Sequence, residues 1–268
     1  MNIIDNTIAR IALPKKDSHK GQNGKLLIIG GSELFHAASA WSLEVASRIV
    51  DMVFYSSIPE NNELIREAKK NFWQGVIVPR GDIASYIDEA DCILIGPGMT
   101  RTDDTKTLTD QLLAKYPKKK WVIDAGALQM ADTSLFTNSM IITPHQQEYE
   151  RVFGESVTQQ NISINSMKHG NVTIVVKGVE DLVAQADRLV YVAGGNEGMT
   201  KGGTGDVLAA LIASLYCLNG AFDSALAGSY INKKAGDALY KTVGPFFNAT
   251  DLVTQLPKTM KEILAPAQ

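Results

Sequence analysis

Short apolar segments alternate along the chain with longer segments whose apolar residues recur at helical spacing. The short segments predict strands that are apolar throughout, at residues 25–29, 52–55, 76–78, 92–95, 121–123, 140–142 and 172–176. The longer segments predict helices at residues 37–50, 60–70, 104–115, 146–153 and 159–169. Fully apolar strands that alternate with helices are typical of an α/β fold with a mostly parallel central sheet and helices on both faces.

The pattern changes after residue 177. Residues 181–184 and 189–192 are strand-like and flank residues 185–188, which predicts a hairpin at an antiparallel edge of the sheet. Helices are expected at residues 207–218, 221–240 and roughly 249–256, the last ending before Pro257. Because no linker, repeat or low-complexity segment interrupts the chain, we expect one domain over residues 1–268.

Composition narrows the class of partner. Hydrophobic residues make up 45% and charged residues 21% of the 268 residues, which is typical of a globular protein. The formal net charge of -3 argues against nucleic acid as a partner. No apolar run approaches membrane-spanning length, and the polar residues in the first ten argue against a signal peptide. Cys92 and Cys217 lie in apolar runs, so we expect buried thiols in a reducing cytoplasm.

A glycine-rich loop that runs straight into an apolar helix carries the strongest chemical signal. Residues 195–206 read Gly-Asn-Glu-Gly-Met-Thr-Lys-Gly-Gly-Thr-Gly-Asp, and residues 207–215 have helical apolar spacing. A helix N-terminus offers free amide donors, and glycine backbone lets an anion approach closely. With Asp206 at the junction, the segment predicts an anion cradle beside a carboxylate, which suits phosphoryl transfer. A simpler alternative is that Asp206 is only a helix N-cap. The loop is not a P-loop, because the P-loop spacing is absent.

Polar or glycine-rich residues also follow several of the predicted strands. Because ligands of such sheets bind outside the carboxyl ends of the strands, we expect these residues to form one wall of a site, with residues 202–206 as the other wall. The segments are Gly30-Gly31-Ser32, Gly96-Pro97-Gly98, Asp124-Ala125-Gly126, Thr143-Pro144-His145 and Lys177-Gly178.

Taken in order, these motifs resemble the ribokinase-like superfamily, and more narrowly the family of NAD(P)H-hydrate dehydratases. The resemblance rests on residues 24–32, 95–98, 122–125, 142–145, 175–178 and 202–206. It implies a single ribokinase-like domain that repairs hydrated NADH or NADPH. The hydroxyl of the hydrate is phosphorylated from ADP, or ATP in some members, and phosphate then leaves to regenerate the reduced dinucleotide. It also implies Mg²⁺ bridging the nucleotide phosphates, and a homo-oligomer such as a tetramer.

The resemblance assigns roles by position. It implies Asp206 as the general base, and a hydrate site that contains Ala38, Gly98, His145 and Asp206. It implies a nucleotide site that contains Lys177, Gly178, Val179, Glu180, Asp181, Gly203, Thr204 and Gly205. Two simpler interpretations stay open, in which Lys177 ends a strand in water and His145 is only a turn residue. The histidines have no ligand-like spacing, so no protein metal site is assigned.

The chain departs from the family pattern around both predicted sites. Residues 35–39 replace Tyr-x-Gly-Ala-Pro, Gly126 replaces an aspartate, residues 146–147 replace Pro-Gly, and Asp181 stands where threonine is common. These changes leave open a small-molecule alcohol kinase, which would use Asp206 in the same way, and a non-catalytic nucleotide sensor. A nicotinamide-dependent oxidoreductase is disfavoured because the dinucleotide-binding fingerprint is absent.

Overall fold

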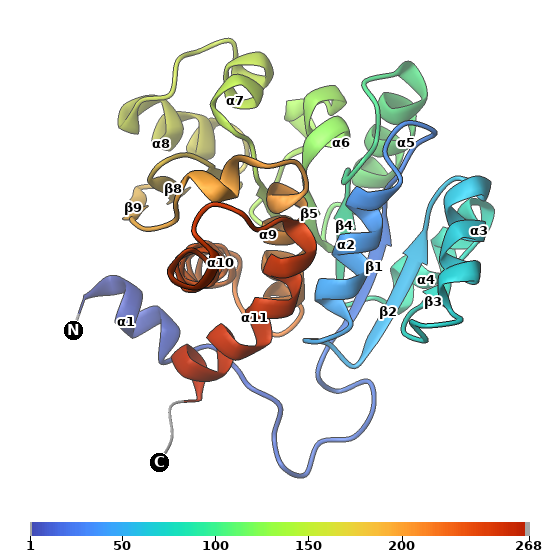
Figure 1. Ribbon diagram of the computed structural model, residues 1–268. Coiled ribbons are helices and arrows are strands. Elements are labelled where there is room, and N and C mark those ends of the chain that lie inside the picture. Colours follow the sequence, from blue (N-terminus) through green and yellow to red (C-terminus); the bar gives the residue numbers. More distant parts are fainter. Residues whose placement is uncertain (1, 266–268) are drawn as a thin grey trace.

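The computed structural model describes residues 2–265 and contains a nine-stranded sheet with helices on both faces (Figure 1). The strands lie in the order β3-β2-β1-β4-β5-β6-β7-β8-β9. The strands from β1 to β7 are parallel to their neighbours, and β8 and β9 add an antiparallel hairpin after β7. Their bounds are β1 (Lys25–Ile29), β2 (Met52–Ser56), β3 (Val76–Ile77), β4 (Cys92–Ile95), β5 (Lys120–Ile123), β6 (Met140–Ile142), β7 (Thr173–Val176), β8 (Asp181–Gln185) and β9 (Arg188–Val192). The predicted fold class is confirmed.

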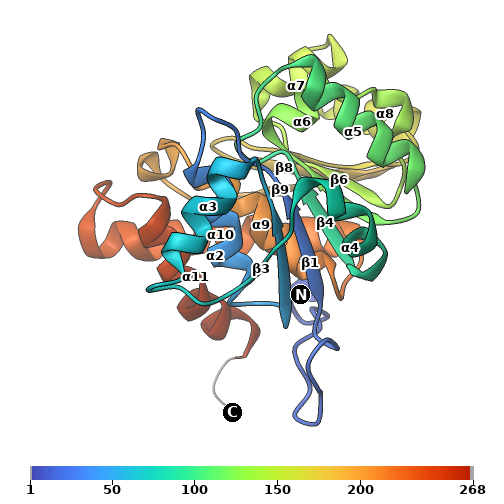
Figure 2. The ribbon, with the colours of Figure 1, turned by 90° about the vertical axis from the view of Figure 1, so that its right-hand side faces the viewer.

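Helices cover the two faces as separate groups, and Figure 2 shows the sheet between them. The helices are α1 (Ile3–Ile8), α2 (Ala37–Ala46), α3 (Pro59–Ala68), α4 (Ile83–Glu89), α5 (Asp103–Lys115), α6 (Ala125–Met130), α7 (Gln146–Phe153), α8 (Gln159–Lys168), α9 (Thr204–Tyr216), α10 (Ala221–Val243) and α11 (Ala249–Leu264). Alternate residues of β1 enter different cores: Leu26 packs with α2, α9, α10 and α11, and Leu27 packs with α4 to α8. A strand buried on both faces explains why the predicted strands are apolar throughout.

The structure corrects some predicted elements. Helix α11 continues through Pro257 to Leu264, so the prediction that it ends before Pro257 is wrong. Leu256 before the proline is buried, and Ile263 and Leu264 after it pack against the same core, which outweighs the lost backbone hydrogen bond. The short helices α1, α4 and α6 were not predicted. Helix α9 begins at Thr204, before the predicted start at residue 207.

The predictions about the cysteines and about membrane-spanning helices can also be compared with the structure. Cys92 and Cys217 are buried free thiols, as predicted. Among residues 2–265, no helix combines the length and apolar character that crossing a bilayer requires.

Candidate functional site

Hydrogen bonds join the predicted loops into one rim at the carboxyl ends of β1, β4, β5, β6 and β7. The amide of Gly31 donates to the carbonyl of Pro97 at 2.7 Å, which links the ends of β1 and β4. The amide of Lys177 donates to the carbonyl of Pro144 at 2.8 Å, which links the ends of β7 and β6. Between them, the amide of Asp124 donates to the carbonyl of Ile95 at 3.0 Å, and the hydroxyl of Thr143 donates to Oδ1 of Asp124 at 2.8 Å. Hydrogen bonds thus link each of these strand ends to the next.

The glycine loop is held at a fixed position against this rim. Gly203 is the N-cap of α9 and has φ +96°, a left-handed conformation that favours glycine. A Cβ on Gly203 would overlap the ring of Trp41 and lie 2.8 Å from Cβ of Ala249. The hydroxyl of Thr204 donates to the carbonyl of Met199 at 2.7 Å, which ties the loop to the start of the helix. The loop is thus wedged between α2 and α11.

Asp206 lies in the first turn of α9 rather than at its junction with the loop. The N-cap position belongs to Gly203, so the alternative in which Asp206 is only a helix cap is wrong. Burial is the main cause that raises the pKa of Asp206 to about 7, and the nearby Asp124 carboxylate raises it further. Lys177 opposes both effects. A carboxyl group with a pKa near neutrality can exchange protons with a bound hydroxyl group.

Lys177 is the cation at the centre of the site. Its Nζ lies 3.0 Å from Oδ1 of Asp124 and 3.9 Å from Oε2 of Glu148. Burial disfavours its charged form, but Asp124, Glu148 and Asp206 together hold the pKa of Lys177 above its ordinary value. Its side chain is only 19% exposed, so the interpretation of Lys177 as a strand end in water is wrong.

Two cavities meet at the glycine loop. The larger cavity has a volume of about 1180 Å³. It is lined by all the residues predicted to contact the hydrate, namely Ala38, Gly98, His145 and Asp206. The smaller cavity has a volume of about 650 Å³. It is lined by most of the residues predicted to contact the nucleotide, namely Lys177, Gly178, Val179, Asp181, Thr204 and Gly205. Gly203 lines the larger cavity instead, and Glu180 lines neither. His145 lines both, so the cavities adjoin each other there.

His145 also has a structural role. It is the N-cap of α7, with its Nδ1 accepting from the amide of Glu148 at 3.3 Å, while the Glu148 carboxylate accepts from the amide of His145 at 2.9 Å. His145 is therefore a structural residue at the turn into α7, as the simpler interpretation states. The side chain remains half exposed and faces both cavities.

Asp181, which departs from the family pattern, is neutralised within the protein. The Nζ of Lys233 lies 3.3 Å from its Oδ1, and the hydroxyl of Ser229 donates to its Oδ2 at 2.7 Å. Lys233 also donates to the carbonyls of Gly178, Val179 and Gly194. Lys233 is not among the predicted site residues, although a lysine among the apolar positions of the predicted helix 221–240 is a usable signal. The ion pair offsets the negative charge that a free Asp181 carboxylate would add to the wall of the 650 Å³ cavity.

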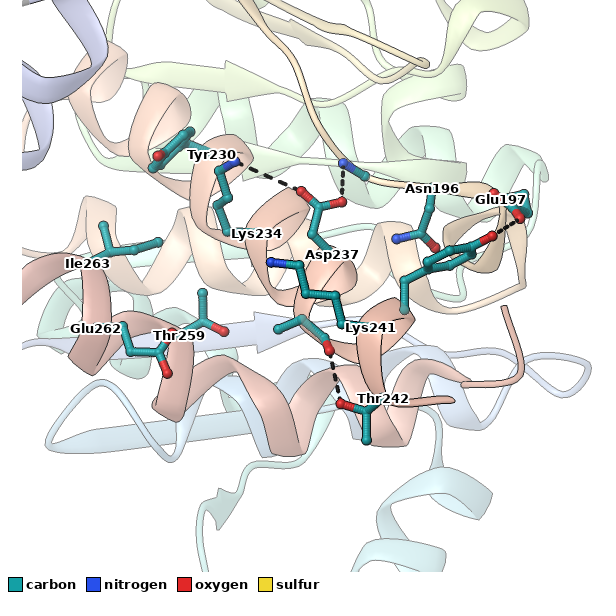
Figure 3. Close-up of a pocket in the computed structure, with 13 residues that line it drawn as sticks. Asn196, Glu197, Tyr230, Lys234, Asp237, Lys241, Thr242, Thr259, Glu262 and Ile263 are labelled. Atoms are coloured by element: carbon teal, nitrogen blue, oxygen red, sulfur yellow. Dashed lines mark hydrogen bonds and ion pairs between the residues drawn. The ribbon is translucent and has the colours of Figure 1, made fainter. Parts of the chain in front are cut away.

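A third cavity of about 780 Å³ lies between α10, α11 and residues 195–197 (Figure 3). In this cavity the Lys234 ammonium lies 3.9 Å from Asp237, and Asp237 accepts from the amide of Gly195 at 3.0 Å. None of the predicted site residues lines it. Residues 195–197 line both this cavity and the 650 Å³ cavity, so the two cavities share this loop as part of their walls.

Known proteins resemble this chain over most of its length. The family model described as NAD(P)H-hydrate dehydratase matches residues 26–258. The ADP-dependent (S)-NAD(P)H-hydrate dehydratase of Cenarchaeum symbiosum is 31% identical, over 92% of each chain. The bifunctional NAD(P)H-hydrate repair enzyme Nnr of Methanocaldococcus jannaschii is 36% identical over 93% of this chain, which spans 51% of that protein. The chain therefore spans about half the length of several relatives.

The solved structures show the same fold. The ADP/ATP-dependent NAD(P)H-hydrate dehydratase of Bacillus subtilis, co-crystallized with ATP/Mg²⁺, superposes with a TM-score of 0.80 over 97% of each chain at 22% identity. A ribokinase-like superfamily protein of Enterococcus faecalis is also similar. The ribokinase-like α/β class is confirmed.

Proposed function

The chain belongs to the NAD(P)H-hydrate dehydratase family, and from this premise we propose that it dehydrates hydrated NADH or NADPH with a nucleotide, ADP in preference to ATP, as phosphoryl donor. One observation carries the proposal. Asp206 lines the 1180 Å³ cavity, whereas Thr204 and Gly205, immediately before it, line the 650 Å³ cavity. A phosphoryl group can therefore pass at the start of α9 from a donor in one cavity to an acceptor in the other.

The proposed reaction uses these positions in two steps. The hydroxyl of the hydrate attacks the terminal phosphorus of the nucleotide, while Asp206 accepts the hydroxyl proton. The bond between that phosphorus and the bridging oxygen breaks, and AMP leaves when ADP is the donor. The carbon–oxygen bond to the new phosphate group then breaks with loss of a ring proton, which restores the double bond and releases inorganic phosphate. The protein thus acts as a lyase, and the nucleotide makes the hydroxyl a good leaving group.

Charge stabilisation is assigned to the loop and to Lys177. Amides at the start of α9 and the glycine backbone at residues 203–205 offer donors to the transferred phosphoryl oxygens. Lys177 lines the nucleotide cavity, and its ammonium is close to Gly205: a Cβ built on Gly205 would lie 3.4 Å from Nζ. A fixed cation beside an amide cradle neutralises the charge that develops during transfer.

Mg²⁺ fits this site as an ion bound by the nucleotide. Within residues 2–265, no three His, Cys, Asp or Glu side chains are grouped so that they could hold a metal. Mg²⁺ commonly relies on phosphate oxygens and water, with few protein ligands, and when bound it would neutralise phosphate charge. Asp124 and Glu148 are the nearby carboxylates, and both already face Lys177.

The test is turnover of prepared NADH hydrate with ADP or ATP and Mg²⁺, followed by the return of reduced-nicotinamide absorbance. We expect recovery with wild-type protein and a rate lower by at least about 10²-fold with Asp206→Asn. Net accumulation of a phosphorylated alcohol would instead identify a small-molecule kinase. Nucleotide binding without any turnover of the hydrate would contradict the proposal and favour a sensor.

A further inference from the structure

Two arginines without ion-pair partners lie in the wall of the 1180 Å³ cavity. Four of the seven arginines in the chain form ion pairs with carboxylates, namely Arg10, Arg48, Arg66 and Arg188. Arg101 and Arg151 form no ion pair within residues 2–265, and both line this cavity. Among the described residues that line it, Asp206 is the one carboxylate, so the arginines outnumber the anions in its wall.

Arg151 is held in position by hydrogen bonds that lead back to the centre of the site. Its guanidinium donates to Oε1 of Gln129, on α6. Nε2 of Gln129 donates to Oε1 of Glu148 at 3.0 Å, and Oε2 of Glu148 accepts from the amide of His145 at 2.9 Å. A guanidinium carries five N–H donors, so most of those on Arg151 remain for a ligand. A side chain that is already oriented loses less freedom when it binds one.

Helix α6 connects the segments that carry the two arginines. A Cβ on Gly126 would overlap the carbonyl oxygen of Met99, so α6 begins directly against the backbone that leads to Arg101. Gln129, one turn later on the same helix, holds Arg151. Both arginines are therefore placed along the α6 side of the cavity.

The arginines lie beyond the part of the cavity where transfer is proposed. His145 lines both cavities and is the N-cap of α7, and Arg151 follows it by six residues on that helix, which is about 9 Å along the axis. In the proposed reaction, the hydrated ring lies with its hydroxyl against Asp206. One ribose separates the nicotinamide ring from the diphosphate in a dinucleotide, so the diphosphate extends past His145 toward Arg151.

We infer that Arg101 and Arg151 bind the diphosphate of the hydrated dinucleotide. This inference rests on the proposed function, which supplies a substrate with two phosphate charges. The planar fork of an arginine makes paired, charge-assisted hydrogen bonds with phosphate oxygens. The diphosphate is common to NADH and NADPH, so the two arginines serve both substrates and do not select between them.

Calorimetric binding of NADH, NADPH and ADP to the intact protein tests the inference. We expect the double variant Arg101→Gln/Arg151→Gln to bind NADH and NADPH at least about tenfold more weakly than the wild type. Its affinity for ADP, which is assigned to the 650 Å³ cavity, should be unchanged. Arg66→Gln removes one such charge from α3, outside the cavity, and is the matched control that should change none of these affinities.

Unchanged affinity of the double variant for NADH would overturn the inference. Weaker binding of NADPH alone would also overturn it, because the arginines would then bind the 2′-phosphate. So would a loss of NADH affinity in Arg66→Gln as large as that in the double variant, since net charge would then explain both.

Kinetics with NADH hydrate supply a second readout. The double variant should raise KM by at least about tenfold and leave kcat within about twofold, because the diphosphate is bound alike before and during transfer. The binding measurements use no hydrate, so the two proposals can fail separately. Arginine-dependent NADH binding without hydrate turnover would refute only the proposed function. Hydrate turnover with unchanged KM and NADH affinity in the double variant would refute only the role of the arginines.

Discussion

Nζ of Lys177 lies 3.0 Å from Oδ1 of Asp124, although the strand β6 separates the two strands that these residues follow. The hydroxyl of Thr143, at the end of β6, donates to the same Oδ1 at 2.8 Å. Asp124 is 2% exposed, so its charge depends on these two partners. The contact joins the ends of β5, β6 and β7, and it places a cation beside the carboxylate proposed as the base.

Lys177→Met should destabilise the protein and shift its pH profile. Removal of the cation leaves the buried Asp124 carboxylate with only the Thr143 hydroxyl as partner, and we expect a loss of about 3 kcal/mol in the free energy of unfolding. It also removes the charge that lowers the pKa of Asp206, so the pH at which turnover reaches half its maximum should rise. Denaturant unfolding and a pH–rate profile measure the two effects. Lys177→Arg keeps the charge and is the control; an unchanged profile in Lys177→Met would refute this coupling.

Asp206→Asn should reduce turnover while it increases stability. Loss of a general base lowers the rate by roughly 10²- to 10⁴-fold. The pKa of Asp206 is raised chiefly by burial, so its ionised form is disfavoured in the folded protein. A neutral amide there should increase the free energy of unfolding at neutral pH by ~1–2 kcal/mol, after allowance for partial solvent screening. Parallel turnover and denaturation assays check both signs, and a variant that is both active and less stable would contradict them.

The rate of the wild-type protein should rise with pH and level off above about 7. The base must be ionised to accept a proton, and burial raises the pKa of Asp206 to about 7 from 3.8.

The same raised pKa makes the folded protein less stable as the pH rises. The folded state holds this proton more tightly than the unfolded state, so the contribution is fully present below about 3.8 and is lost as the pH rises through about 7. A log plot of kcat/KM against pH without a limb near 7 would exclude Asp206 as the titrating base.

Two adjacent glycines provide a matched pair of substitutions. Gly203→Ala forces a side chain into Trp41 at a backbone φ of +96°, so the loop must move and turnover should fall by at least about tenfold. Gly202→Ala meets no atom within 4 Å and should leave turnover within about twofold of wild type. Steady-state kinetics on both proteins tests this. If both variants lose turnover to a similar extent, the contact between Gly203 and Trp41 is not the cause of the loss.

The Asp181–Lys233 pair should be strongly coupled in a double-mutant cycle. Lys233→Met alone leaves the buried Asp181 carboxylate without a cation and should cost about 3 kcal/mol in the free energy of unfolding. Asp181→Asn alone leaves Lys233 with its three carbonyl acceptors. The double variant should be more stable than the sum of the two single losses indicates, by at least ~1 kcal/mol. Strict additivity in denaturant unfolding would show that the contact carries no net coupling.

Local patterns explain why the strands and the rim were predictable. Leu26 and Leu27 face opposite cores, so both must be apolar, and each rim motif directly follows a strand of this kind. The partners in contacts between distant segments could not be predicted in this way. The Asp181–Lys233 pair joins β8 to α10, and α11 passes through Pro257 because of the core on which it packs. The third cavity is lined by polar helix positions that resemble an ordinary solvated surface in the sequence.

The position of Trp41 gives the protein a built-in optical reporter. Its indole lines the 1180 Å³ cavity beside Gly203 and is oriented by a 3.1 Å hydrogen bond from Nε1 to Thr250. Reduced nicotinamide absorbs where tryptophan emits, whereas the hydrate lacks that absorption band. We therefore expect Trp41 emission to be quenched by energy transfer at the moment the double bond is restored, so that the chemical step can be timed separately from release of the product into solution.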